Sequence, residues 1–570
     1  MDAKKRRICR NIAIYFALIV VIMFAVWISL LQYRTPEVVS IDADSSEFSA
    51  ERAMEYLQEI TKEPHPVGSE AHAEVREYLI SALTSFGLSP EVQEAWVSNT
   101  SSWGYFYEGP VKNVVARIPG EDSSAAIMLT AHYDSVEGSP GAADDGSGVA
   151  AMLETIRILT NSDSLKNDVI ILFSDAEEIG TIGAQVFADQ HPWAKEIGVV
   201  LNFEARGNEG PAVLFETSDG NDRMITVYSE VVPNAIANSL YFEVYKHLVN
   251  NTDLSVYKAA GMHGYNLGFI QGGQSYHSSS DSADNLSMTS LQHMGDSMLS
   301  LVKSLGYMDL VDQDEGNRVY FNLIGNKVVS YLEKWVKPLM ITSVFFFIAT
   351  LVHGYIRKKI TVLGTLGGLL LFLLTGGASY LMGQYFYSYL MNAYADQAWI
   401  LAESNSTSLA LFIGSIVFIF GFVALIYRLA SKIFKPYNLT IGAFIVWQVL
   451  VIYSSYYYVG ASYLFIWPFL MGLIGVNLNF ILSWKHWKLN FLVKLAVQIP
   501  ILLITAPIIY LIYNFWFLEA TPIQSVLIVL MSAFMIPILC TSRKTAKKTT
   551  VPKNDENEGS PHLILNMNSN

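Results

Sequence analysis

The sequence predicts a membrane-anchored α/β protein in which one globular domain precedes a long hydrophobic region. Strand-like apolar runs alternate with helix-like segments between residues 33 and 327, and the remaining third is dominated by apolar segments. Alternation of this kind favours a central, mostly parallel or mixed sheet that is flanked by helices on both faces. The 570 residues are 52% apolar and only 15% charged, which is too apolar for an ordinary soluble enzyme.

The N-terminal segment, residues 1–32, predicts a signal anchor. Five Lys or Arg residues within the first ten are followed by about twenty largely apolar, uncharged residues at 11–31, which is long enough to cross a bilayer. A cleaved signal peptide is the alternative, but no clear small-x-small cleavage site precedes Gln32. We therefore expect a cytoplasmic N-terminus and a retained helix.

The globular region, residues 33–327, contains both kinds of element. Helices are expected at 46–62 and 69–86, separated by Pro64 and Pro66, which interrupt helical continuity. Further helices are expected at 149–159, 182–190, 222–232 and 289–305. Strands are expected at 111–118, 126–130, 169–174, 199–203 and 212–216. This order is typical of an α/β fold.

The hydrophobic region, residues 328–540, is expected to form a membrane domain of about seven helices. The candidate spans are 338–352, 362–385, 409–427, 441–458, 463–484, 491–513 and 523–540. Lys and Arg cluster on every second connector, and the intervening connectors 392–407 and 514–521 have neither. By the positive-inside rule the basic connectors and the polar, disordered tail 541–570 are cytoplasmic, and the globular domain is extracytoplasmic.

Charge and cysteine content exclude several classes of partner and site. The net charge of −14 argues against nucleic acid, because phosphate binding needs a basic surface. Cys9 and Cys540 are the only cysteines, so neither a disulfide framework nor a zinc site made of thiolates is possible. Any metal must therefore be held by His and carboxylates.

The stretch 131–148, AHYDSVEGSPGAADDGSG, lies between an expected strand and an expected helix. It carries His132, Asp134, Asp144 and Asp145, and such a loop presents side chains at the carboxyl edge of a parallel sheet. Taken alone, it is equally consistent with a solvated polar turn. A metal site requires further ligands at neighbouring strand ends.

Three later loops supply such ligands. Glu177 and Glu178 follow the strand at 169–174, Glu204 follows the strand at 199–203, and His277 lies in a Ser-rich loop. Adjacent glutamates point in different directions, so one can bind a metal while the other reaches a metal-bound water. An acid-rich helix N-terminus and an exposed loop histidine are the alternatives, but four such loops after apolar strands favour a shared site.

At this point the chain resembles the co-catalytic zinc aminopeptidase family, which includes secreted bacterial aminopeptidases and glutamate-carboxypeptidase-like enzymes. The resemblance rests on HYD at 132–134, GAADDGSG at 141–148, DAEEIG at 175–180, NFEARG at 202–207, YHSSSD at 276–281 and PHPVGS at 64–69. It is closest to the membrane-anchored branch typified by fungal vacuolar membrane proteases and the endoplasmic reticulum metallopeptidase, and it identifies 33–327 as a zinc peptidase domain.

The resemblance implies a site with two Zn²⁺ ions. His132 and Glu204 would complete one zinc site, Glu178 and His277 the other, Asp144 would bridge the ions, Glu177 would be the general base, and Asp134 would orient His132. Many family members have Asp where this chain has Glu204. Two such ions lower the pKa of a water from about 15.7 towards roughly 7, which implies peptide hydrolysis without a covalent intermediate.

Three further loop residues are expected to orient a substrate or to support the site. Arg206 and Tyr276 lie beside the expected ligands, where either orients a substrate or makes a structural pair within the loop, and we favour the structural role. Asp281 is expected to support the loop of His277. The sequence predicts neither the substrate's side chain nor the oligomeric state.

Three functions are consistent with the sequence. The first is a membrane-anchored di-zinc exopeptidase, an aminopeptidase, with peptide substrates and the lipid bilayer as partners. The second is a single-zinc glutaminyl cyclase, which resembles the same fold. The third is a transporter or receptor with a degenerate, ligand-binding peptidase fold. The spans have few central ionisable residues, which transporters often need, so we interpret the spans as an anchor or regulator.

Overall fold

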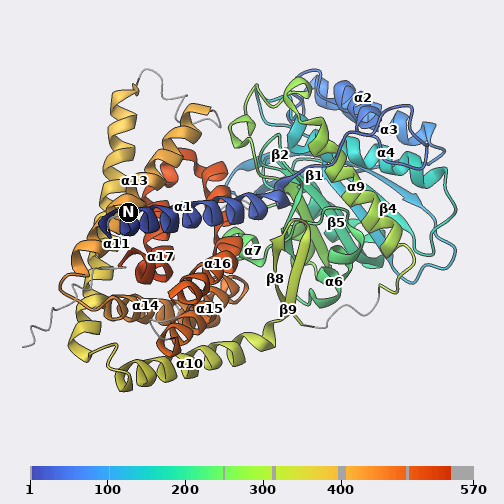
Figure 1. The fold of residues 1–570 in the computed structure, drawn as a ribbon. Helices are drawn as coiled ribbons and strands as arrows, with labels where there is room; N and C mark the ends of the chain where they lie inside the picture. Colours follow the sequence, from blue (N-terminus) through green and yellow to red (C-terminus); the bar gives the residue numbers. More distant parts are fainter. Residues whose placement is uncertain are drawn as a thin grey trace, which may run out of the picture.

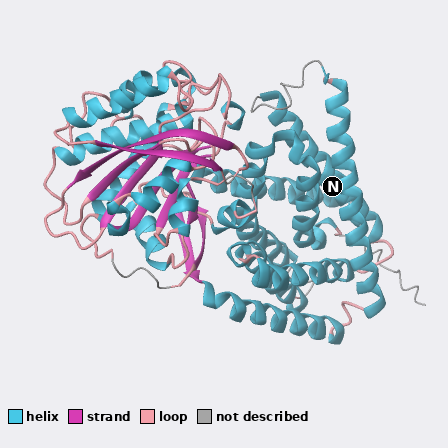
Figure 2. Cartoon of the chain, turned by 180° about the vertical axis from the view of Figure 1, so that it is seen from behind, coloured by secondary structure: helices cyan, strands magenta, loops and turns pink. Residues whose placement is uncertain are grey.

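The computed structural model describes residues 3–101, 103–247, 251–310, 316–395, 406–482 and 487–540. An α/β body and an all-helical bundle lie side by side, and helix α1 extends along the bundle towards the sheet (Figures 1 and 2). The predicted disordered tail, 541–570, and the basic connector residue Lys485 lie outside the described residues.

The α/β body is built on a mixed seven-stranded sheet, as predicted, in the order β1-β2-β4-β3-β5-β7-β6. The strands are β1 (Glu91–Thr100), β2 (Phe106–Ile118), β3 (Ala126–His132), β4 (Val169–Ser174), β5 (Ile197–Ala205), β6 (Val213–Thr217) and β7 (Gly264–Phe269). Strands β4, β3, β5 and β7 are mutually parallel, whereas β2 is antiparallel to β4 and β6 is antiparallel to β7. The parallel strands therefore end at one edge of the sheet.

The central strands were predictable because both of their faces are buried. Every residue of β3 and β4 is buried, and both sequences are almost continuously apolar. Strand β7 was missed because its sequence, GYNLGF, lacks such a run. Its buried Asn266 instead donates hydrogen bonds to Glu216 Oε2 at 3.0 Å and Thr252 Oγ1 at 2.8 Å, which compensates for burying a polar side chain.

Helices cover both faces of the sheet (Figure 2). One layer comprises α2 (Ala50–Ile60), α3 (Glu70–Ser85), α4 (Gly148–Thr160), α6 (Asp222–Val231) and α9 (Met288–Leu305), which share one apolar core with the sheet. The opposite layer comprises α5 (Ile182–Gln190) and α8 (Asp253–Ala259). The six helices predicted in this region are present with bounds that differ by at most four residues, whereas α7 (Ser239–Tyr245) and α8 were not predicted.

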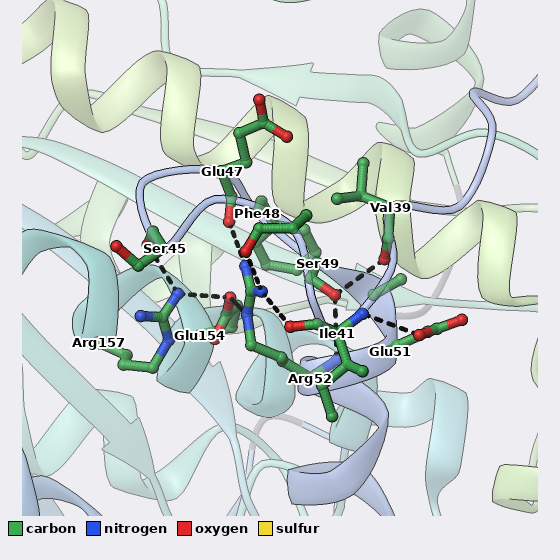
Figure 3. A network of polar contacts seen from close by, with 12 residues as sticks. Val39, Ile41, Ser45, Glu47, Phe48, Ser49, Glu51, Arg52, Glu154 and Arg157 are labelled. Carbon is green, nitrogen blue, oxygen red and sulfur yellow. Dashed lines mark hydrogen bonds and ion pairs between the residues drawn. The ribbon is translucent and has the colours of Figure 1, made fainter.

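An ion-pair network joins α2 to α4, the helix that follows the Asp144 turn (Figure 3). Glu154 is completely buried, and its two carboxylate oxygens lie 2.7 Å from Arg52 Nε and 2.7 Å from Arg157 Nε. Arg52 Nη2 also donates to the backbone oxygen of Glu47 at 2.5 Å. The carboxylate of Glu154 therefore pairs with two guanidinium groups, one from α2 and one from α4.

Replacing Glu154 by Ala is expected to destabilise the protein by about 3 kcal/mol, because two partly buried guanidinium groups lose their counter-ion. Thermal unfolding of the full chain in detergent should show a lowered Tm. The matched control is Glu59→Ala on α2, which removes an exposed pair with Lys62 and should cost less than about 1 kcal/mol. Equal losses of Tm in the two variants would contradict this interpretation of the network.

The C-terminal part is helical and hydrophobic. Its helices are α10 (Val336–Ile356), α11 (Val362–Ala393), α13 (Ser406–Ala430), α14 (Pro436–Tyr457), α15 (Tyr463–Ile481), α16 (Trp487–Trp516) and α17 (Thr521–Leu539). Six candidate membrane spans occur among the described residues, and the last, Leu492–Leu539, covers most of α16 and all of α17. Helix α1 (Ala3–Leu30) packs against α16. The signal anchor and the domain boundaries at 32, 327 and 540 stay predictions.

The bundle is docked on the α/β body through α7 and the turn between α14 and α15. Ser239 Oγ donates to the backbone oxygen of Gly460 at 2.6 Å, and the Gly460 amide donates to Glu243 Oε1 at 2.9 Å. Tyr463 Oη donates to Asn238 Oδ1 at 2.7 Å, and its ring stacks on Phe321 of β8 (Arg318–Ile324). These contacts fix α7, and the sheet edge beside it, against the bundle.

Candidate metal centre

The structure brings together all of the predicted ligands at the carboxyl edge of the parallel strands. His132 ends β3, Glu178 follows β4, Glu204 lies near the end of β5, and His277 lies in the loop after β7. Asp144 comes from the turn between β3 and α4. Neighbouring strands thus supply ligands to one point, as expected for this type of sheet.

Asp144 lies between the two histidines, with one carboxylate oxygen facing each. Asp144 Oδ1 lies 3.2 Å from His132 Nε2, and Asp144 Oδ2 lies 3.2 Å from His277 Nε2. His277 Nε2 is also 3.1 Å from Glu178 Oε2, and His132 Nε2 is 4.0 Å from Glu204 Oε2. Two ligands of one tetrahedral zinc ion are separated by about 3.3 Å, given zinc–ligand bonds of about 2.0–2.2 Å. Three of the four spacings are close to this separation, and the fourth, between His132 and Glu204, is wider.

Candidate ligand atoms of His132, Asp144 and Glu178 lie within 4.8 Å of one another.

Glu204 is held by Asn202, whose Nδ2 donates to Glu204 Oε1 at 3.2 Å and to Asn266 Oδ1 at 2.9 Å. A buried amide pair across β5 and β7 therefore holds the carboxylate of Glu204. Asn202 lies in the NFEARG motif but had no predicted role, and Asn266 belongs to none of the motifs, so sequence reasoning missed this pair.

The carboxylate of Asp134 joins two of the ligand-bearing loops. Asp134 Oδ1 and Oδ2 accept hydrogen bonds from the backbone amides of Glu177 at 3.0 Å and Glu178 at 3.1 Å. His132 Nδ1 is 2.9 Å from the backbone oxygen of Asp134 and 3.5 Å from its Oδ1. An Nδ1–H that donates to this carbonyl leaves Nε2 free to bind a metal. The carboxylate thus mainly holds the glutamate turn, and the backbone carbonyl makes the shorter contact with the imidazole.

Asp281 holds the loop of Asp144 to the loop of His277. Its carboxylate accepts hydrogen bonds from the amides of Ala143 at 2.7 Å and Asp144 at 3.3 Å. The expected support of the His277 loop therefore takes the form of a link between both ligand-bearing loops. The peptide bond between Asp144 and Asp145 is cis, and Gly141 begins this turn with a φ of +68°.

Burial and the repulsion between neighbouring carboxylates shift the pKa values of the acids in this cluster. Burial and the charge of Asp144 raise the pKa of Glu178 to about 7. Burial also raises the pKa values of Glu177 and Glu204 well above their ordinary range. Burial opposes ionisation of Asp144 as well, but hydrogen bonds from His132 and His277 lower its pKa to about 2. Glu178 Oε1 is buried without a hydrogen-bond partner, and bound cations would relieve this surplus of carboxylates.

A cavity of about 360 Å³, which the sequence analysis did not predict, opens beside the predicted metal ligands. Glu177, Asp144 and Glu204 line one end, and residues of α16 and α17 line the other. Arg206 lies at the boundary, with its guanidinium 5.1 Å from the ring centre of Tyr276 and 5.0 Å from that of Phe515. The favoured structural pairing of Arg206 with Tyr276 is present, but its second aromatic partner belongs to the helical bundle.

Residues 113–302 match the profile of peptidase family M28. A vacuolar membrane protease of Candida dubliniensis is 33% identical over 280 residues, which are 47% of this chain and 30% of that protein. Endoplasmic reticulum metallopeptidase 1 of Homo sapiens is 32% identical over 336 residues, covering 55% of this chain and 36% of that protein. The chain thus spans about a third of the length of these relatives, and the predicted resemblance is confirmed.

Two solved structures are similar to part of this chain. An aminopeptidase from Aneurinibacillus sp. strain AM-1 is 14% identical with a TM-score of 0.38, covering 48% of this chain and 98% of its own. A glutaminyl cyclase from Porphyromonas gingivalis is 20% identical with a TM-score of 0.38, covering 46% of this chain and 100% of its own.

Proposed function

We propose that the chain, in which a match to peptidase family M28 at residues 113–302 is followed by six candidate membrane spans among the described residues, is a membrane-anchored di-zinc aminopeptidase. The observation that carries the proposal is the position of Asp144, whose two carboxylate oxygens face one histidine each at 3.2 Å. A carboxylate presented in this way is suited to bridge two cations. His132 and Glu204 would hold one ion, and Glu178 and His277 the other.

Zinc bound there supplies a Lewis acid that activates water and stabilises negative charge on a peptide carbonyl oxygen. Glu177 is the candidate general base, because it lines the cavity together with Asp144 and Glu204. Its backbone is fixed by Asp134. Glu177 would take a proton from the attacking water and deliver it to the leaving amine, an effect typically worth about 10²–10⁴-fold.

The proposal includes the orientation of the chain in the membrane. Lys435 Nζ, before α14, donates at 2.9 Å to the backbone oxygen of Lys358, after α10. Two of the basic connectors therefore meet at one end of the bundle, as the positive-inside rule requires of connectors on the same side. We place this end in the cytoplasm and the peptidase domain on the extracytoplasmic side, with α1 as the anchor.

Removal of metal tests the proposed activity. The purified full chain in detergent should release N-terminal amino acids from a mixture of peptides, and a zinc chelator should abolish the release. Added zinc should restore the release of amino acids. The restored protein should then contain two zinc ions per chain when its metal content is measured by mass spectrometry. One zinc ion per chain together with pyroglutamate formation from N-terminal Gln would instead identify a glutaminyl cyclase.

Chelator-resistant release would contradict zinc catalysis. Blocking the peptide's N-terminus by acetylation provides the control for specificity: an aminopeptidase should lose activity on the acetylated peptide, whereas an endopeptidase should cleave both peptides. Absence of any hydrolysis, with saturable peptide binding, would favour the receptor or transporter function.

A further inference from the structure

The cavity beside the metal ligands is shared between the peptidase domain and the membrane bundle. On the peptidase side it is lined by the acids of the site and by apolar residues of β6, α7 and β7, such as Val213, Tyr241 and Phe269. On the other side it is lined by helices α16 and α17, including Leu511, Phe515 and Leu527. Its volume of about 360 Å³ lies within the range of small-ligand sites, about 300–1,000 Å³.

Apart from the acids and Arg206 at the catalytic end, the lining is predominantly apolar. Three exposed lining residues are also apolar: Val244 on α7, Trp516 at the end of α16 and Ile523 at the start of α17. The apolar character thus extends to the exposed part of the cavity beside the α16–α17 turn. An apolar pocket that ends at catalytic carboxylates favours a substrate with an apolar group next to the reacting bond.

We propose that helices α16 and α17 form a wall of the substrate pocket and that the preferred substrates are peptides with a bulky apolar N-terminal residue. The membrane bundle is then part of the active site rather than only an anchor. This inference rests on the proposed peptidase function. The apolar N-terminal side chain would occupy the space between Phe269 and Leu511, and its peptide bond would lie towards Glu177.

The docking of the two bodies supports a pocket of fixed shape. Arg206 follows β5, and its guanidinium lies over Phe515 of α16, while Tyr510 Oη of the same helix donates to Gln271 Oε1 at 3.4 Å. With the contacts of α7 described above, these interactions hold α16 against the loops that carry the ligands. A side chain that grows from α16 into the cavity would therefore reduce the pocket.

The test compares peptides that differ only in their N-terminal residue, Phe, Leu, Ala or Lys, with the metal-loaded full chain in detergent. If the N-terminal Leu or Phe side chain is fully buried in the pocket, kcat/KM should be about 10- to 100-fold higher than for the Ala peptide. Leu511→Trp should lower kcat/KM for the Phe peptide at least 10-fold more than for the Ala peptide. Leu511→Ala should raise kcat/KM for an additional peptide with N-terminal Trp relative to the Phe peptide.

Ile499→Trp is the matched control, because Ile499 lies on α16 with 40% of its surface exposed and does not line the cavity. Its ratio of Phe to Ala activity should equal that of the wild type. Both activities are measured on one preparation of each variant. Misfolded protein therefore lowers the Phe and Ala activities equally and leaves their ratio unchanged. A wild-type preference for Ala or Lys, or equal effects of Leu511→Trp on all peptides, would overturn the inference and leave the peptidase function intact.

A binding measurement separates this failure from failure of the proposed function. Calorimetry of the Phe peptide with the Glu177→Gln variant should show binding that an added Leu511→Trp substitution weakens at least 10-fold. If the wild type hydrolyses no peptide and this binding persists, the peptidase function fails while the pocket assignment stands. If the Phe peptide does not bind, or binds no more tightly than the Ala peptide, the pocket assignment is wrong.

Discussion

Replacing Glu177 by Gln is expected to lower kcat for peptide hydrolysis about 10²–10⁴-fold with the zinc content unchanged. The amide has nearly the size of the carboxylate but cannot accept the proton of the attacking water. Glu177 is buried and lines the cavity, whereas its backbone amide, not its side chain, makes the bond to Asp134. The substitution should therefore leave the turn that carries Glu178 in place.

The measurement combines steady-state kinetics with metal analysis of the same preparation. Glu137→Gln provides the control, because Glu137 is an exposed carboxylate in the loop between His132 and Asp144, and this variant should retain full activity. A Glu177→Gln variant that hydrolyses peptides at the wild-type rate would show that another group is the base. A variant that loses zinc would instead assign Glu177 to the metal ligands.

The parts of the fold that the sequence predicted are those in which burial produces a simple pattern. Strands β3 and β4 are buried on both faces and read as apolar runs, and the ligands lie directly at or after their ends. Once the strands were placed, parallel pairing of β3 with β4 and β5 required His132, Glu178 and Glu204 to lie close together. The proximity of these three side chains could therefore be predicted from the order of the strands, whereas their binding of metal stays a prediction.

The remaining features depend on contacts between distant segments. Asn266 lies in β7, a strand without an apolar run, so its bond to Asn202 behind Glu204 had no local signal. The pocket wall is less predictable still, because Arg206 meets Phe515 only after the bundle docks on the α/β body. In the sequence, α16 shows only the hydrophobicity of a membrane span, which does not reveal that it lines a pocket.

Replacing Asp144 by Asn should remove both zinc ions together, because its two oxygens face the histidines of the two proposed sites. An amide offers one oxygen and an uncharged group, so it cannot bridge two cations as a carboxylate does. We expect the metal content of the purified full chain to fall from two ions towards none, with loss of hydrolysis.

Asp145→Asn is the matched control on the adjacent residue. Burial and the charges of Glu204 and Asp144 raise the pKa of Asp145 well above its ordinary value. Asp145 Oδ1 accepts a hydrogen bond from the Gly148 amide at the start of α4, which Asn can also do. The control should therefore keep both ions and most of the activity. Equal zinc loss in the two variants would show that Asp144 does not bridge the ions and that the acidic turn acts as a whole.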